Sequence, residues 1–147
     1  CPTSAQSFSS QTVAKVQQYI AGQQTFFVLE TLETLRKNGR LSNLKAFVAN
    51  VLNIKPVMGA TPEGQICQLA QAQGTNKALE RMVREIKNRT KNQEERILAI
   101  AHCNCPQRAQ RVRERIEKLM HFKKILILDT AGVSSMYAND GGVIVAV

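Results

Sequence analysis

The stretch "RILAIAHCNCPQRAQRVRERIEKLMHFKKILILDT" spans residues 96–130 and decides the fold class. Its continuous apolar run at 96–103 predicts a central strand buried on both faces. A second buried strand is predicted at 123–130, and the amphipathic segment at 106–120 predicts a helix between the two. The inward positions of that helix are expected to be Ala109, Val112, Ile116 and Leu119.

The same alternation continues on both sides of this stretch. "GGVIVAV" at 141–147 predicts a third buried strand, and residues 76–89 predict another amphipathic helix. "TPEG" at 61–64 is a turn signal between two strand-like segments and predicts a hairpin. Strands and helices in alternation, with one antiparallel hairpin, predict an α/β fold with a mixed sheet flanked by helices. The inward residues of the helix at 76–89 are expected to be Leu79, Met82, Val83 and Ile86.

The N-terminal part divides into a polar segment and the start of the domain. Residues 1–11 are small and polar, and we interpret them as a linker or a remnant of a missing domain. The domain is predicted to cover 12–147, beginning with a short helix at 12–22 and a strand at 25–30. Because the chain begins without Met, we expect a processed or truncated piece.

A glycine turn separates two predicted helices. The first helix, at 31–39, is closed by Gly39, which can adopt the left-handed conformation of a helix C-cap. The second is capped by Ser42 or Asn43 and ends before Pro56. Its apolar residues recur at i, i+3, i+4 and i+7, and they are Leu44, Phe47, Val48 and Val51.

Composition narrows the class of partner. The chain has 147 residues with 20 Lys and Arg against 11 Asp and Glu, a net charge of +9. Such a charge suits a solvated surface, an acidic protein partner or nucleic acid. Basic residues alternate with acidic ones along the helices, which favours a solvated surface. Aromatic residues are 5% and Trp is absent, so no stacking platform for bases is predicted. The sequence shows no apolar run long enough to span a membrane and no signal peptide.

The cysteines and histidines do not indicate catalysis. Four cysteines without a regular framework predict reduced thiols and a cytoplasmic protein. "HCNC" at 102–105 could bind a metal, but a structural zinc site needs four ligands and no second pair is present at the usual spacing. His102 is therefore interpreted as a buried core residue, and Asp129, at a strand end, is a weak catalytic candidate. No cofactor and no metal are predicted.

Two segments carry possible ligand chemistry. Arg40 offers a planar guanidinium for a carboxylate or phosphate, and the helix after it is apolar. An anionic head near Arg40 with an apolar tail along that helix would make a lipid site, whereas a core helix after a capped turn is the plain alternative. "YANDGG" at 137–142 is either a tight loop or a cradle for a polar head group.

Two longer stretches resemble the DegV family. They are "LETLRKNGRLSNLKAFVANVLNIKPVM" and, at the end, "AGVSSMYANDGGVIVAV". The family carries an "L..L...GRIS...A.....L.IKP" segment, and the resemblance covers roughly residues 12–147. It implies the C-terminal domain of a two-domain α/β protein.

The resemblance also implies a function. DegV-like proteins bind a long-chain fatty acid in an apolar tunnel and present it to a separate fatty acid kinase, which makes an acyl phosphate for phospholipid synthesis. The chain would then be a carrier and not an enzyme. Two hydroxyl residues of the other domain would hold the carboxylate. The implied head-group residues are Arg40, Ser42, Tyr137 and Asn139, and the implied tail residues are Phe47, Val48 and Val51.

One departure and three alternatives stay open at this point. Many family members have "HTGPG" where this chain has "YANDG", so Tyr137 stands in the histidine's place and cannot carry its positive charge. A structural or regulatory module could instead bind an acidic partner through a basic helical face. A phosphotransfer domain is a less favoured alternative, because neither His102 nor His121 lies in a suitable loop. Transient contact with a membrane surface is also left open. The basic face comprises Arg108, Arg111, Arg115 and Lys118.

Overall fold

The structure is a computed structural model that describes residues 4–41 and 53–147. Within these ranges the strands form one six-stranded sheet in the order β3-β2-β1-β6-β4-β5. β4 and β5 run parallel, whereas every other neighbouring pair is antiparallel. The predicted mixed α/β sheet is confirmed. The strands are β1 Thr25–Val28, β2 Ile54–Ala60, β3 Ile66–Gln73, β4 Ile97–His102, β5 Lys124–Asp129 and β6 Val143–Ala146.

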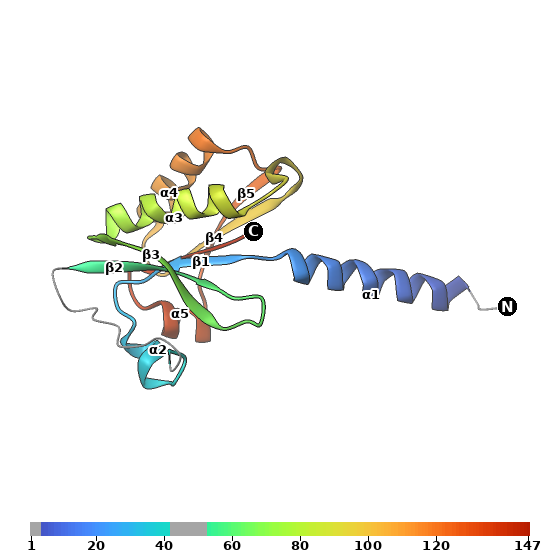
Figure 1. Cartoon of the computed structure of the whole chain (residues 1–147), viewed down its shortest axis with the longest axis horizontal. Coiled ribbons are helices and arrows are strands. Elements are labelled where there is room, and N and C mark those ends of the chain that lie inside the picture. Colours follow the sequence, from blue (N-terminus) through green and yellow to red (C-terminus); the bar gives the residue numbers. More distant parts are fainter. Residues whose placement is uncertain (1–3, 42–52) are drawn as a thin grey trace.

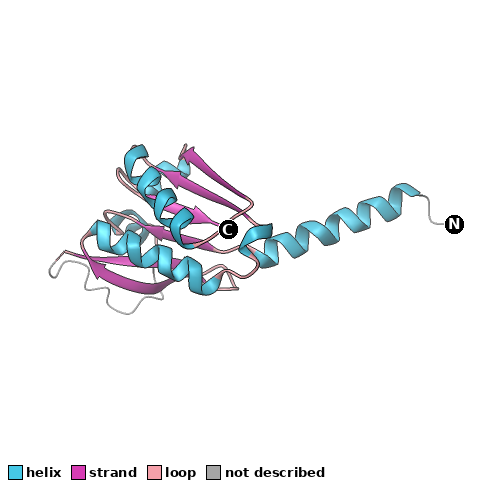
Figure 2. Ribbon diagram, turned by 90° about the horizontal axis from the view of Figure 1, so that it is seen from above, coloured by secondary structure: helices cyan, strands magenta, loops and turns pink. Residues whose placement is uncertain are grey.

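Two long helices cover one face of the sheet and two short helices lie on the other (Figure 1, Figure 2). α3 and α4 pack on the first face with the main hydrophobic core. α2 and α5 pack on the second face around a smaller core. The helices are α1 Ser4–Gly22, α2 Glu33–Lys37, α3 Thr75–Arg89, α4 Pro106–Leu119 and α5 Val133–Ala138, with a 3-10 turn at Gln93–Glu95.

The helical predictions for α3 and α4 hold with one exception. All four predicted inward residues of α3 are buried, as are the first three of α4. Leu119 is 48% exposed, contrary to the prediction. The helix ends at Leu119. The backbone of Met120 is extended, and the side chain of Met120 packs in the core where that of Leu119 was expected.

β4 and β5 are less buried than the apolar runs predicted. Leu98 and Ile100 are fully buried beneath the helices, but Ile97 is 48% exposed on the other face. β5 is an edge strand, and Leu128 is 49% exposed. The prediction of two-sided burial is therefore wrong within the described residues, because α3 and α4 cover one face only.

The predicted hairpin is confirmed as β2 and β3. β2 begins at Ile54, so Pro56 lies inside the strand and does not mark its start. The antiparallel register shifts between Val57 and Met58, which is a bulge. Val57 packs in the main core and Met58 in the smaller one, so the hairpin contributes to both faces.

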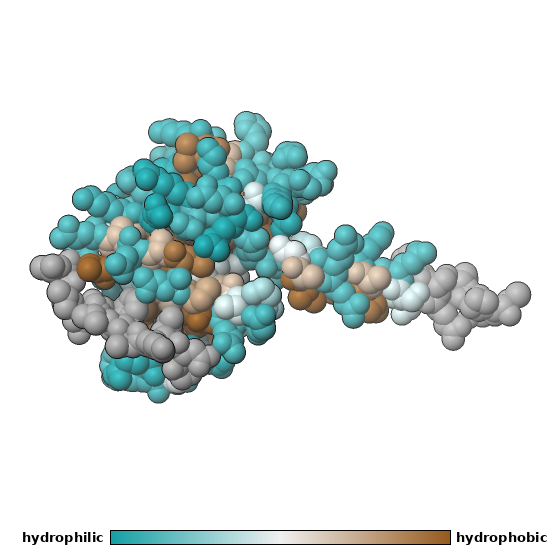
Figure 3. Space-filling model, in the orientation of Figure 1, coloured by the Kyte–Doolittle hydropathy of each residue, from teal (hydrophilic) through white to brown (hydrophobic). Residues whose placement is uncertain are grey.

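α1 is longer than predicted and extends away from the sheet (Figure 1). It begins at Ser4 and not near Thr12, because no proline or glycine interrupts the chain between Ser4 and Gly22. Residues 4–11, interpreted as linker, are therefore helical. Apolar side chains gather along one side of α1 (Figure 3), and Val13, Val16 and Ile20 are at least half exposed. The division into 1–11 and 12–147 stays a prediction.

α1 joins the body through its C-terminal end. Arg96 donates a hydrogen bond from Nη1 to the carbonyl oxygen of Gly22 at 2.8 Å. The backbones of Gln24 and Val147 exchange two hydrogen bonds, which extend the pairing of β1 with β6. In the described part of the chain, no helix has the length and apolar character needed to cross a membrane.

Candidate functional site

A cavity of about 570 Å³ lies on the sheet face that carries α2 and α5. Its floor comes from β1, β3 and β6, and its walls come from α2, α5 and the turn after α2. This volume falls in the range of small-molecule sites, and most of its surface is apolar. The lining residues used below are Phe27, Leu35, Arg40, Ile66, Tyr137 and Ile144.

Strand alternation places the apolar floor. Along β1, Phe26 and Val28 point into the main core, whereas Phe27 points to the opposite face. Ile144 pairs directly with Phe27 across β1 and β6, so the two side chains share that face. Sequence reasoning did not identify either residue as part of a cavity. The period-two pattern of "TFFVLE" carried the signal, because only one of two adjacent Phe residues can face the core.

Arg40 reaches the cavity from a helix cap. Gly39 has a φ of 69°, which is the left-handed conformation predicted for it. The amide of Gly39 donates to the carbonyl oxygen of Arg36 at 3.0 Å, and the amide of Arg40 donates to that of Leu35 at 2.9 Å. This pair of bonds is the Schellman motif, which ends α2 and turns the chain at Arg40. Arg40 lines the cavity, and no described residue hydrogen-bonds or ion-pairs with its guanidinium.

Tyr137 belongs to a helix and not to a loop. The segment at 137–142 was expected to be turn-like throughout, but Tyr137 and Ala138 form the last turn of α5. Asn139 follows as the C-cap of that helix, with a φ of 55° and a ψ of 170°, a positive-φ conformation outside the left-handed helical region. Tyr137 lines the same cavity as Arg40, so the structure brings these two predicted residues together.

Asn139 connects the two short helices. Its Oδ1 accepts a hydrogen bond from the Thr34 hydroxyl of α2 at 3.2 Å, and its Nδ2 donates to the carbonyl oxygen of Tyr137 at 3.1 Å. Asn139 is not among the residues that line the cavity. Its contacts therefore hold α2 and α5 together, and its predicted place in a head-group network would be indirect.

Four predicted site residues cannot be placed. Ser42, Phe47, Val48 and Val51 lie outside the described residues, as does the helix predicted from them. Their assignment to the head group and the tail of a lipid remains a prediction.

The histidine and cysteines of "HCNC" lie at the end of β4 and in the turn before α4. His102 is 5% exposed, as predicted for a core residue. Its Nε2 lies 3.5 Å from Oδ1 of Asp129, and its Nδ1 accepts from the Cys105 amide at 3.4 Å. Burial raises the pKa of the Cys105 thiol, which disfavours the thiolate that a nucleophile or metal ligand needs. Among the described residues no group of three His, Cys, Asp or Glu side chains gathers around a metal position.

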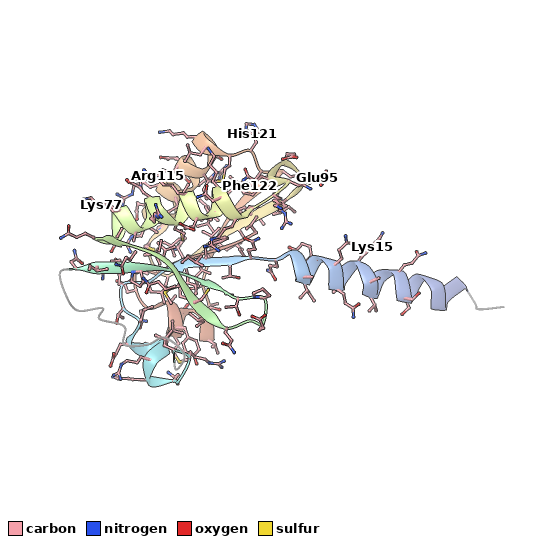
Figure 4. The ribbon with its side chains drawn as sticks, viewed as in Figure 1. Lys15, Lys77, Glu95, Arg115, His121 and Phe122 are labelled. Atoms are coloured by element: carbon pink, nitrogen blue, oxygen red, sulfur yellow. The ribbon has the colours of Figure 1, made fainter. Side chains whose placement is uncertain are left out.

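The basic face predicted on α4 is not one surface. Arg108 is mostly buried and pairs with Glu30 at 2.7 Å, so it does not belong to a solvated face. Arg115 pairs with Glu80 of α3 at 2.7 Å. Figure 4 shows Arg115 on the outer helical layer, on the same side of the molecule as Lys77 of α3. The prediction of one docking surface that comprises Arg108, Arg111, Arg115 and Lys118 is therefore wrong in the residues that it includes.

Comparison with known proteins agrees with this geometry. The chain matches the family model described as "Uncharacterised protein, DegV family" over residues 6–147. A DegV domain-containing protein of Streptococcus pyogenes is 33% identical over 138 residues, which are 91% of this chain and 47% of that protein.

Two solved structures of similar proteins share the fold of this chain and contain fatty acids. A DegV-family protein of Ruminococcus gnavus, solved with vaccenic acid, has a TM-score of 0.90 and 49% identity over 94% of this chain and 49% of its own. The fatty acid kinase (Fak) B3 protein of Streptococcus pneumoniae, loaded with linoleic acid, has a TM-score of 0.81 and 30% identity over 93% and 48%. The chain thus spans about half the length of these relatives. By its family match and its fold, the chain belongs to the DegV family.

Proposed function

We propose that the full-length protein carries a long-chain fatty acid and presents it to a fatty acid kinase, which forms an acyl phosphate for phospholipid synthesis. The observation that carries this proposal is the apolar cavity that Arg40 and Tyr137 line together. Two similar proteins, those of R. gnavus and S. pneumoniae, were solved with fatty acids, and the second is named for a fatty acid kinase. In this proposal the protein is a non-catalytic carrier in the cytoplasm.

The acyl chain would lie along the sheet floor. Phe27, Ile66 and Ile144 offer apolar surface from three strands, and Leu35 adds apolar surface from α2. Transfer of a hydrocarbon chain from water to such surface is favourable by about 0.8 kcal/mol per methylene group. Leu128 is also exposed on the sheet face beyond the cavity, so apolar surface remains uncovered there.

The carboxylate would lie at a polar edge of the cavity beside Arg40 and Tyr137, which both line it. A guanidinium can donate two parallel hydrogen bonds to a carboxylate, and a phenol can donate one. Tyr137 supplies a neutral donor where relatives with histidine can supply a charged one. Arg40 therefore carries the positive charge of this site in our proposal, and Ser42 and the absent half of the protein would supply further donors.

The direct test is a measurement of the lipid that copurifies with the full-length protein. We expect an organic extract to contain fatty acids of about 14 to 18 carbons, the range that the family resemblance implies. Burial of each methylene group favours their retention by about 0.8 kcal/mol. Mass spectrometry of the extract, with an unrelated protein purified in parallel, measures this. Fatty acid at no more than the control level would contradict the proposal.

Arg40→Ala should weaken fatty-acid binding by roughly tenfold or more, since loss of a charged donor in a desolvated site leaves the carboxylate unpaired. Arg36→Ala is a matched control. Arg36 is exposed and pairs with Glu33 within α2, so its removal should leave binding unchanged. Titration of palmitic acid into full-length variants measures both, and equal affinities would reduce Arg40 to a turn residue.

A further inference from the structure

Glu30 is the centre of a charged cluster outside the cavity. Its carboxylate contacts Lys55 of β2 at 3.1 Å, Arg108 of α4 at 2.7 Å and the Thr75 hydroxyl at the start of α3 at 3.1 Å. Lys55 also donates to the carbonyl oxygen of Glu30 at 2.7 Å. One partly buried carboxylate thus links the segment after β1 to β2, α3 and α4.

Arg108 extends this cluster to the segment after α5. Its Nη1 donates to the carbonyl oxygen of Gly141 as well as to Glu30. Gly141 has a φ of 82°, and a Cβ atom there would lie 2.8 Å from that Nη1. Only glycine permits both this backbone conformation and the close approach of the guanidinium, which accounts for the first glycine of "YANDGG".

The turn at 139–142 is held from other sides as well. The Gly141 amide donates to the carbonyl oxygen of Cys103 at 2.9 Å, and the Asn104 side chain donates to Oδ1 of Asp140 at 2.8 Å. Asn139 bonds the Thr34 hydroxyl of α2, as described above. Arg108 is the cationic member of this set, and it reaches the turn from the helical layer opposite the cavity.

We propose that Arg108 and Glu30 form a positioning pair that fixes the 139–142 turn and thereby places Tyr137 at the polar edge of the cavity. Neither side chain lines the cavity, so both act through the turn. This inference rests on the proposed function for its ligand, but the contacts that carry it are independent of any ligand. It also gives Arg108 a role other than contact with an acidic partner.

The charge state of the pair suits this role. Burial acts to raise the pKa of Glu30, but hydrogen bonds from Lys55, Thr75 and Arg108 outweigh it and hold the pKa below its usual 4.5. Glu30 is therefore ionised at neutral pH. A carboxylate accepts a stronger hydrogen bond from Arg108 than a neutral acceptor would.

The experiment compares Arg108→Ala, Glu30→Gln and Arg111→Ala in the full-length protein. Arg111 is the matched control, because it lies on α4 and, among the described residues, its side chain bonds only the carbonyl oxygen of Gln107 in its own helix. Hydrogen exchange of the amides at 139–142, without ligand, should accelerate in the first two variants and not in the control. Palmitic acid should bind roughly tenfold more weakly to Arg108→Ala, since the Tyr137 donor loses its fixed position.

A double-mutant cycle with Tyr137→Phe separates positioning from general loss of structure. If Arg108 acts through Tyr137, the double variant should bind palmitic acid no more weakly than the weaker single variant. Additive losses, or unchanged exchange at 139–142, would overturn the proposal. If Arg108→Ala fails to fold, Glu30→Gln decides the exchange arm. If the wild type binds no palmitic acid, the proposed function fails, and exchange alone decides the positioning role.

Discussion

Phe27→Asp is expected to abolish fatty-acid binding by the full-length protein. Phe27 lies on the sheet floor of the cavity, paired with Ile144. A carboxylate at this position would be desolvated by the acyl chain and would repel the ligand's own carboxylate. An unpaired buried charge costs several kcal/mol, so the affinity should fall by ~100-fold or more.

Titration with palmitic acid and mass spectrometry of copurified lipid measure this effect. Phe27→Leu is the matched control, because it keeps an apolar side chain on the same floor and should retain bound lipid. Thermal unfolding of both variants shows whether the fold survives. Lipid content in a folded Phe27→Asp variant equal to that of wild type would place the acyl chain elsewhere.

Gly142→Ala is expected to destabilise the fold by about 3 kcal/mol, as overpacking of a rigid site does. A Cβ atom at Gly142 would lie 2.4 Å from the carbonyl oxygen of Ala138 and 3.0 Å from a methyl group of Leu29. The carbonyl belongs to the last turn of α5 and cannot move without breaking that turn. Chemical denaturation followed by circular dichroism measures the loss.

Gly22→Ala serves as the comparison for this change. Its Cβ atom would lie 3.5 Å from the Arg96 side chain, which is ordinary contact, and Gly22 is the last residue of α1. Alanine favours a helix over glycine, so this variant should be as stable as wild type or slightly more stable. Equal stability of Gly142→Ala and wild type would mean that the backbone at 138–142 adapts freely.

Long periodic segments were predicted well from the sequence. α3 and the β2–β3 hairpin were found because their apolar spacing and turn residues agree with each other. The Gly39 cap was found because left-handed backbone strongly favours glycine. These features depend on local sequence, so one amino-acid sequence is enough to predict them.

Features that depend on neighbours were predicted less well. The burial of β5 was overestimated, because an apolar run does not reveal whether a strand lies at the edge of a sheet. α5 was missed because its six residues are too few to show a helical period. Arg108 looked like a surface charge, since its partner Glu30 is 78 residues away in the sequence.

The candidate site was predicted only in part for the same reason. Arg40 and the segment at 137–142 were singled out from their residue types, and the resemblance then assigned Arg40 and Tyr137 to a head group. The structure brings both to one cavity, although their role stays a prediction. Phe27 and Ile144 were missed, because strand spacing shows that two faces exist but not which one binds a ligand. The predicted tail residues lie outside the described part of the chain.

The alternation along β1 and β6 separates two kinds of evolutionary constraint. Phe26 and Val145 form the core beneath α3 and α4, while their neighbours Phe27 and Ile144 face the cavity. Substitutions at the cavity positions can therefore change the shape of the cavity while the core packing stays intact. If the cavity holds an acyl chain, as proposed, relatives built in this way can diverge in the acyl chains they prefer without first acquiring compensating changes in the core.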